Sequence, residues 1–169
     1  YLFTANEGDA REYAGFTEMR RVGSSAHVLD ATKFPTASTL KTDAQLGRLN
    51  TTTTLGDTDS DGDFDAIYTL GARSFSVWNG LTGDQVFDSK NELDKKALEL
   101  LVYDDTRSDD KGTEPEAVTV GKVGSKQIAI VGLERADAFA IYDITIPTSP
   151  VFVKLIKTGD APEGVLFIP

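Results

Sequence analysis

The sequence contains no cysteine, and this absence excludes several kinds of site at once. Thiol catalysis, disulfide bonds and cysteine-ligated zinc are impossible within the chain. No apolar run approaches the roughly 18 residues of a membrane span, and no segment has the pattern of a signal peptide. A secreted protein without disulfides needs another means of stabilisation, and a bound calcium ion is an obvious one.

Basic residues are scarce relative to acidic ones, with 17 Lys and Arg against 27 Asp and Glu and a formal net charge of −10. We therefore expect no nucleic-acid partner and no direct membrane insertion, since anionic polymers and surfaces attract cationic proteins. An acidic surface instead suits metal cations and a salty exterior. Plain solubility is an equally good reading of the charge alone.

Common catalytic patterns are also missing. The sequence has no G-x-S-x-G, phosphate-loop or H-E-x-x-H motif. The single histidine, His27, lies in a polar segment, so we expect a surface residue rather than a catalytic base. Trp78 and Tyr142 occupy matching positions of a repeat described below, which predicts that both belong to the core. The Asn50-Thr51-Thr52 glycosylation sequon is weak, because such triplets arise by chance.

Short segments rich in β-branched and aromatic residues, separated by turn residues, predict a mainly β fold. Only Asn91–Leu101 has apolar residues at helical spacing. Both ends of the chain resemble strand interiors, so we expect residues 1–169 to be part of one domain truncated at each end. The predicted strands are Tyr1–Ala5, Ala66–Leu70, Ser74–Trp78, Gln85–Phe87, Ala117–Val120, Gln127–Leu133, Ala138–Asp143, Val151–Ile156 and Gly164–Ile168.

An internal repeat favours a β-propeller, built from blades of a few short strands. Gly71 and Gly132 hold equivalent positions in it, and Tyr1–Glu7 resembles a third copy of its first strand. About three blades fit this chain, fewer than the roughly four to eight of a closed propeller. A β-sandwich is the alternative. The matching segments are Ile67–Arg73 with Ile128–Glu134, Phe75–Trp78 with Phe139–Tyr142, and Val86–Phe87 with Val151–Phe152.

The blade assignment predicts where charged residues gather. Ala117–Val120, Gln127–Leu133, Ala138–Asp143 and Val151–Ile156 are interpreted as strands A, B, C and D of one blade. The B–C and D–A connections of a propeller emerge on one face. Acids that end B strands or begin A strands should meet there, close to the central channel; they are Glu7, Glu116, Glu134 and Glu163.

A calcium loop is the clearest motif, with the pattern D-x-D-x-D-G-x-x-D. Calcium takes six to eight oxygen ligands, and alternate Asp residues of a tight loop can converge on one ion. Gly62 would permit the sharp turn. The flanks are not helical and Tyr68 replaces the final Glu, which disfavours an EF-hand. Interpreted as an A–B connection, the loop would face away from the channel. Its proposed ligands are Asp57, Asp59, Asp61, Asp63 and Asp65.

Several ordered motifs resemble the choice-of-anchor I family of bacterial surface and secreted proteins, over nearly the whole chain. Mesenchyme-specific cell-surface glycoproteins are similar, as are atypical alkaline phosphatase-like and phytase-like propellers. The resemblance implies a seven-bladed propeller that is extracellular, secreted or attached to the surface, with the periplasm as an alternative. Ala117 departs from the Gly usual after Pro-Glu. The motifs are Thr4–Arg11, Leu46–Leu49, Gly56–Asp63, Arg73–Trp78, Arg107–Gly112, Glu114–Glu116, Gly132–Arg135 and Ala161–Gly164.

Two functions stay open. We favour a non-catalytic extracellular module with structural calcium. Its acidic channel face would bind a cell-surface partner, a mineral or a phosphorylated ligand. The remaining blades would come from further sequence of the same protein or from another chain. The alternative is a calcium-dependent phosphoesterase, in which acids of this face hold metal ions that activate water and cations bind phosphate. Its candidate residues are Glu7, Asp9, Arg11, Arg107, Asp109, Asp110, Lys111, Glu116, Glu134, Arg135 and Glu163.

Overall fold

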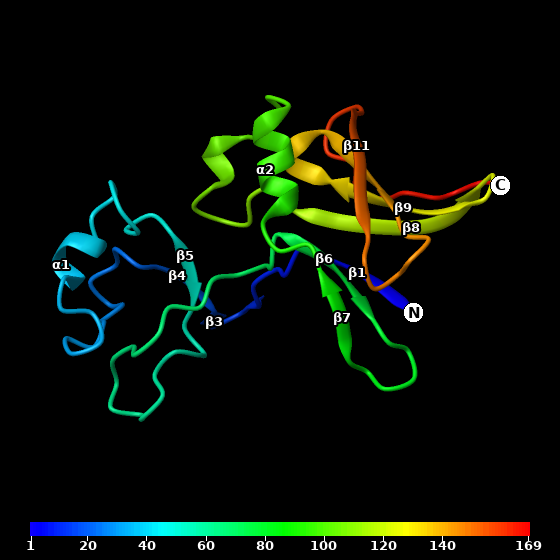
Figure 1. Cartoon of the computed structure of the whole chain (residues 1–169). Helices are drawn as coiled ribbons and strands as arrows, with labels where there is room; N and C mark the ends of the chain where they lie inside the picture. Colours follow the sequence, from blue (N-terminus) through cyan, green and yellow to red (C-terminus); the bar gives the residue numbers. More distant parts are fainter. The chain divides into compact units, whose positions relative to one another are not determined.

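The computed structural model describes residues 1–169, which form mainly antiparallel β-sheets (Figure 1). Helix is confined to α1 (Ala37–Leu40), α2 (Glu92–Glu99) and two 3-10 turns, η1 (Asp105–Arg107) and η2 (Glu134–Ala136). The predicted mainly β class is therefore confirmed. The chain divides into two compact units: unit 1 comprises Tyr1–Glu7, Gly71–Arg107 and Lys111–Pro169, and unit 2 comprises Gly8–Leu70 and Ser108–Asp110.

A four-stranded sheet in unit 1 contains β8 (Pro115–Val123), β9 (Lys126–Leu133), β10 (Ala138–Asp143) and β11 (Val151–Lys157). Each strand pairs antiparallel with the next, in the order β11-β10-β9-β8. The order predicted for these four strands is confirmed. Because they alternate in direction, β8 begins at the same edge at which β9 ends, and acids at those two positions are brought together.

A second sheet of unit 1 has the order β1-β6-β7, with β1 at Leu2–Asn6, β6 at Ser74–Trp78 and β7 at Gln85–Asp88. The strand predicted at Ala66–Leu70 is wrong, since only Thr69 of this segment makes a β-bridge, to Thr51. β1 pairs with β6 over its whole length instead. Residues 8–70 are thus inserted between two neighbouring strands.

This insertion corrects the placement of the acidic loop. Residues 57–65 lie between β1 and β6, so the loop is not the short A–B connection that the repeat predicted. Gly71 is the first residue after the insertion. Its φ is +67°, and a Cβ there would lie 2.1 Å from the carbonyl oxygen of Glu7. Only glycine allows the returning chain to pass so close to the end of β1.

The core of unit 1 joins both sheets to α2. Phe75 and Val77 of β6 are fully buried, and Leu93 lies on the buried side of the helix. Tyr142 of β10 is buried as predicted, with its ring centroid 4.6 Å from that of Phe75. The prediction for Trp78 is wrong, because alternation along β6 turns it away from Phe75 and leaves it half-buried, with Nε1 donating to Thr4 Oγ1 at 2.9 Å.

The strand predicted at Gly164–Ile168 is also wrong, because this segment pairs with no other strand. Its side chains nevertheless alternate: Val165 and Phe167 are half-buried, whereas Leu166 and Ile168 are each 79% exposed. Phe167 lies directly against Gly121 of β8. The pattern of a strand is present without the ladder of hydrogen bonds that defines one.

Unit 2 has little regular structure, and its strands were not predicted. β2 (Glu12–Tyr13) pairs with β3 (Phe16–Thr17), and β4 (Met19–Arg21) pairs with β5 (Asn50–Thr52). Its small core contains Val22, Leu29 and Phe64. Strands of two or three residues give too short an alternating pattern to recognise in a sequence. No helix in either unit is long and apolar enough to cross a membrane.

Candidate functional site

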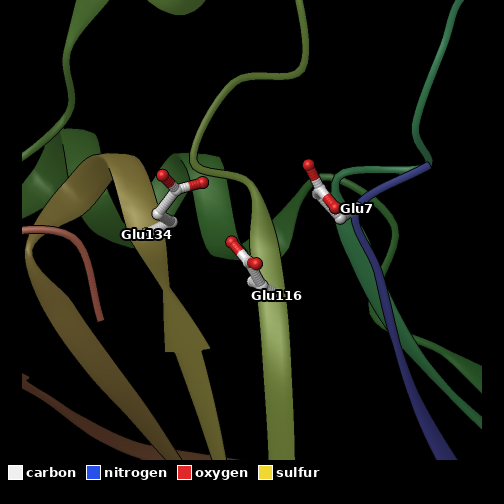
Figure 2. Close-up of side chains that lie close together, drawn as sticks. All are labelled: Glu7, Glu116 and Glu134. Atoms are coloured by element: carbon white, nitrogen blue, oxygen red, sulfur yellow. The ribbon is translucent and has the colours of Figure 1, made fainter. Parts of the chain in front are cut away.

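Three glutamates of unit 1 meet at the edge where β8 begins and β9 ends (Figure 2). Glu7 follows β1, Glu116 stands at the start of β8, and Glu134 begins the turn after β9. One carboxylate oxygen of each lies within 4.8 Å of the others. The sequence-based expectation that acids from these strand ends would come together is met for this trio. We call it the glutamate cluster.

Electrostatics within the glutamate cluster favour an added positive charge. Burial, a hydrogen bond to Glu134, and the charges of Glu134, Glu7 and Glu163 raise the pKa of Glu116 to about 7. The charge of Glu163 is the last of these causes, and Glu163 is not among the three grouped carboxylates. At neutral pH a proton partly relieves the repulsion, and a divalent cation would relieve it more completely.

The basic candidates of unit 1 belong to an ion-pair network around Glu114, which is 1% exposed and has a φ of +50°. Arg107 Nε donates to its Oε1 at 3.0 Å, and Lys111 Nζ lies 3.3 Å from its Oε2. Arg135 is 3.7 Å from Glu114 and 2.9 Å from Glu134, and Lys111 also pairs with Glu7. The sequence-based candidate residues did not include Glu114, although it opens the Glu114-Pro-Glu116 motif.

The remaining catalytic candidates belong to unit 2: Asp9, Arg11, Asp109 and Asp110. Arg11 pairs with Glu18, a buried carboxylate that sequence reasoning missed, with Nε 3.0 Å from Oε2. Asp109 accepts hydrogen bonds from Arg21 and Arg48. These pairs have the character of structural contacts within unit 2.

The acidic loop divides into two groups of carboxylates. Oxygens of Asp57, Asp59 and Asp61, all exposed, lie within 4.8 Å of one another. Asp63 and Asp65 instead group with Asp30, again within 4.8 Å. Asp30 was not predicted, because it reaches the loop through a parallel bridge between Leu29 and Phe64 that no local pattern reveals.

Hydrogen bonds hold the loop in a tight turn. Asp57 accepts from the backbone N–H groups of Ser60 and Gly62, at 2.7 and 3.1 Å. Gly62 has a φ of +102°, which agrees with its predicted place at the sharp bend. Asp65 Oδ2 accepts from the backbone and hydroxyl of Thr58, at 2.8 and 2.7 Å, and these bonds lower the pKa of Asp65.

Asp63 differs from the other acids of the loop. Its Oδ1 is buried and has no hydrogen-bond partner. Burial is the main cause of its raised pKa, followed by the charges of Asp61, Asp30, Asp65 and Asp59. A buried carboxylate oxygen surrounded by other carboxylates needs a counter-charge, because neither water nor a donor compensates its desolvation.

One further prediction in unit 2 is wrong, and the weak glycosylation sequon lies in an unsuitable place. His27 is only 1% exposed rather than on the surface, because its ring stacks on Phe64 at a centroid distance of 4.1 Å. Asn50 of the sequon is 6% exposed and lies in β5, where its N–H donates to Asp109 O. A buried strand residue is a poor acceptor for a bulky glycan.

The chain is mainly β, and its candidate sites consist of acidic residues. The family model of the choice-of-anchor I domain matches residues 1–147. The chain belongs to the choice-of-anchor I family, and this membership supports the surface or anchored class. It is also similar to Gigasin-3a of Magallana gigas, with 32% identity over an alignment of 132 residues; the match covers 69% of this chain and 46% of that protein.

The chain thus spans about half the length of the curated relative that it matches. No solved structure matches the chain.

Proposed function

We propose that the chain is a non-catalytic module of an extracellular, secreted or surface-attached β-propeller, and that calcium stabilises it through the acidic loop. The observation that carries the calcium proposal is the buried, unpartnered Oδ1 of Asp63. A hard divalent cation supplies the missing partner, and oxygen ligands are the type that calcium prefers. The same ion would relieve the repulsion recorded in the raised pKa of Asp63.

Propeller architecture is supported by the two sheets of unit 1. A four-stranded antiparallel meander, β8 to β11, shares a hydrophobic core with the β1-β6-β7 sheet. Blades of a propeller are four-stranded antiparallel sheets that pack face to face. In this interpretation the glutamate cluster lies where B–C and D–A connections emerge, and it serves as the attachment point for a cationic partner or a mineral.

Calcium binding is tested by thermal unfolding with calcium and with EDTA. We expect calcium to raise the melting temperature of the wild-type protein and D63N to lose most of that rise. D63N should also stabilise the calcium-free protein, because it removes a charge from a crowded group. D43N is the matched control, since Asp43 is an exposed aspartate of the same unit outside the loop. Identical melting with calcium and EDTA would refute the proposal.

A metal-dependent phosphoesterase is the second candidate, and the convergence of Glu7, Glu116 and Glu134 favours it. Such a trio can hold a metal ion that activates water. The ion-pair network around Glu114 weighs against it, because Arg107, Lys111 and Arg135 already face carboxylates. Phosphate bound there would compete with Glu114, which is nearly inaccessible to solvent.

Release of phosphate from a generic ester, measured with calcium, magnesium, manganese and zinc in turn, separates the two functions. The module hypothesis predicts no metal-dependent release above the background without protein. Release that requires a metal and is lost in E116Q, while D63N retains it, would establish the phosphoesterase instead.

A further inference from the structure

Unit 2 contains a histidine that is buried without a hydrogen-bond partner on either ring nitrogen. His27 is 1% exposed, and both Nδ1 and Nε2 lack a partner. Its ring lies nearly parallel to that of Phe64, with 19° between the planes and 4.1 Å between centroids. A neutral imidazole tolerates this position far better than an imidazolium, which needs water or an acceptor for both N–H groups.

The charged groups that act on this ring are Arg20 of β4 and Lys41, which follows α1, and both are cations. Arg20 Nη1 donates to Ala26 O at 2.8 Å, and Lys41 Nζ donates to His27 O at 2.7 Å. Burial first, and then these two cations, lower the pKa of His27. Protonation would place a third positive charge beside them in an apolar setting.

Phe64 connects His27 to the acidic loop, because it stands between Asp63 and Asp65. Its N–H donates to Val28 O at 2.9 Å, and its carbonyl accepts from the N–H of Asp30 at 3.0 Å. The segment that carries His27 is thus joined to the loop by one ring stack and two backbone hydrogen bonds. Loss of the stack weakens the same pairing that brings Asp30 to Asp63 and Asp65.

We propose that His27 is an acid-sensitive switch, whose protonation expels the ring from its stack on Phe64 and opens the pairing of residues 28–30 with Phe64. Opening separates Asp30 from the rest of its carboxylate group and so releases the bound cation. This regulation rests on the calcium function proposed above, but the opening itself requires no ion.

The direction of the pH effect follows from linkage. Because the pKa of His27 is lower in the folded protein, its contribution to stability is complete above about pH 6.5, the ordinary value for histidine. That contribution is lost as the pH falls toward the folded-state pKa. One proton is taken up on opening, so the opening equilibrium rises about tenfold per pH unit within this window.

Amide hydrogen exchange with EDTA present tests the switch without calcium. We expect the protection factors of the Phe64 and Asp30 amides to fall about tenfold per pH unit below about pH 6.5. Those of Val131 and Ala140, paired across β9 and β10 of unit 1, should stay constant. His27 is the only histidine, so the titration of its imidazole can be followed by NMR without further assignment of the signal.

The variant H27F keeps an aromatic ring on Phe64 but cannot be protonated, and its protection factors should not change with pH in this range. H27L serves the same purpose if the larger ring does not fit. An imidazole that titrates at or above pH 6.5, or wild-type protection that is constant with pH, would overturn the proposal. A pH dependence that persists in both variants would also overturn it and assign the effect to the carboxylates.

Calcium titrations at pH 7.5 and 5.5 then test the coupling to the loop. Wild-type affinity should fall by about tenfold more than that of H27F, by the same one-proton linkage. Equal losses of calcium affinity in the two proteins would show that protonation of His27 does not cause cation release. If the wild-type protein binds no calcium at pH 7.5, the calcium function fails, and the exchange experiment alone decides whether His27 opens the segment.

Discussion

Carboxylate oxygens of Glu116 and Glu134 lie within 4.8 Å of each other, and burial together with this neighbouring carboxylate raises the pKa of Glu116 to about 7. The two residues come from neighbouring strands, β8 and the turn after β9. Because the pKa of Glu116 is about 7, the glutamate cluster changes charge in the physiological range. Stability at this edge of unit 1 is therefore linked to pH, and the binding of a cation there would be linked to pH as well.

Stability should fall with rising pH because of Glu116. Its pKa is higher in the folded than in the unfolded protein, so its contribution is complete below about pH 4.5 and is lost as the pH rises through about 7. E116Q should flatten this slope and stabilise the protein at pH 8 by about 1 kcal/mol, a value reduced for solvent screening. Urea unfolding followed by fluorescence of Trp78, the only tryptophan, measures it. An unchanged slope in E116Q would exclude the raised pKa of Glu116 as its cause.

Removal of Glu114 should be strongly destabilising. E114A leaves Arg107, Lys111 and Arg135 without their common buried partner, and breaking a buried ion pair from one side typically costs about 3–5 kcal/mol. E99A is the matched control, because Glu99 pairs with Lys96 but is 60% exposed, which predicts a loss of about 1 kcal/mol or less. Equal losses in urea unfolding would show that the network contributes no more than a surface pair.

Gly71 should tolerate substitution much less well than Gly83. Both residues have positive φ, +67° and +79°, but a Cβ at Gly71 would lie 2.1 Å from Glu7 O, whereas one at Gly83 meets nothing within 4 Å. G83A should therefore cost only the conformational strain of about 1 kcal/mol. G71A should cost more than about 2 kcal/mol and shift the Glu7 backbone. Comparable melting temperatures for the two variants would contradict this close approach.

The sequence predicted the parts of unit 1 in which local pattern and long-range packing agree. Strands β8 to β11 have β-branched runs bounded by turn residues, and their antiparallel order follows from short connections. The same reasoning placed Glu7, Glu116 and Glu134 together, because side chains at strand ends follow directly from strand direction. The helix near Asn91–Leu101 was recognisable from its apolar spacing.

The errors arose where residues distant in the sequence decide the structure. The segment Ala66–Leu70 has the composition of a strand, but β1 already occupies the position beside β6. His27 appeared exposed because its neighbours are polar, whereas Phe64 covers it from another part of unit 2. Asp30 and Glu114 gain their importance from contacts that no spacing rule encodes. The binding of calcium by the loop stays a prediction.

The insertion between β1 and β6 constrains the order in which the protein can assemble. During synthesis β1 leaves the ribosome before β6 and must wait for residues 8–70 before its partner exists, since Leu2 pairs with Trp78 and Asn6 with Ser74. Until then its hydrogen-bonding edge is open to incorrect partners, a recognised route to aggregation. Early compaction of unit 2 would shorten the effective loop between the strands and lower its closure entropy. Conditions that stabilise unit 2 should therefore raise the yield of correctly folded chains, even when they have no direct effect on the β1-β6-β7 sheet.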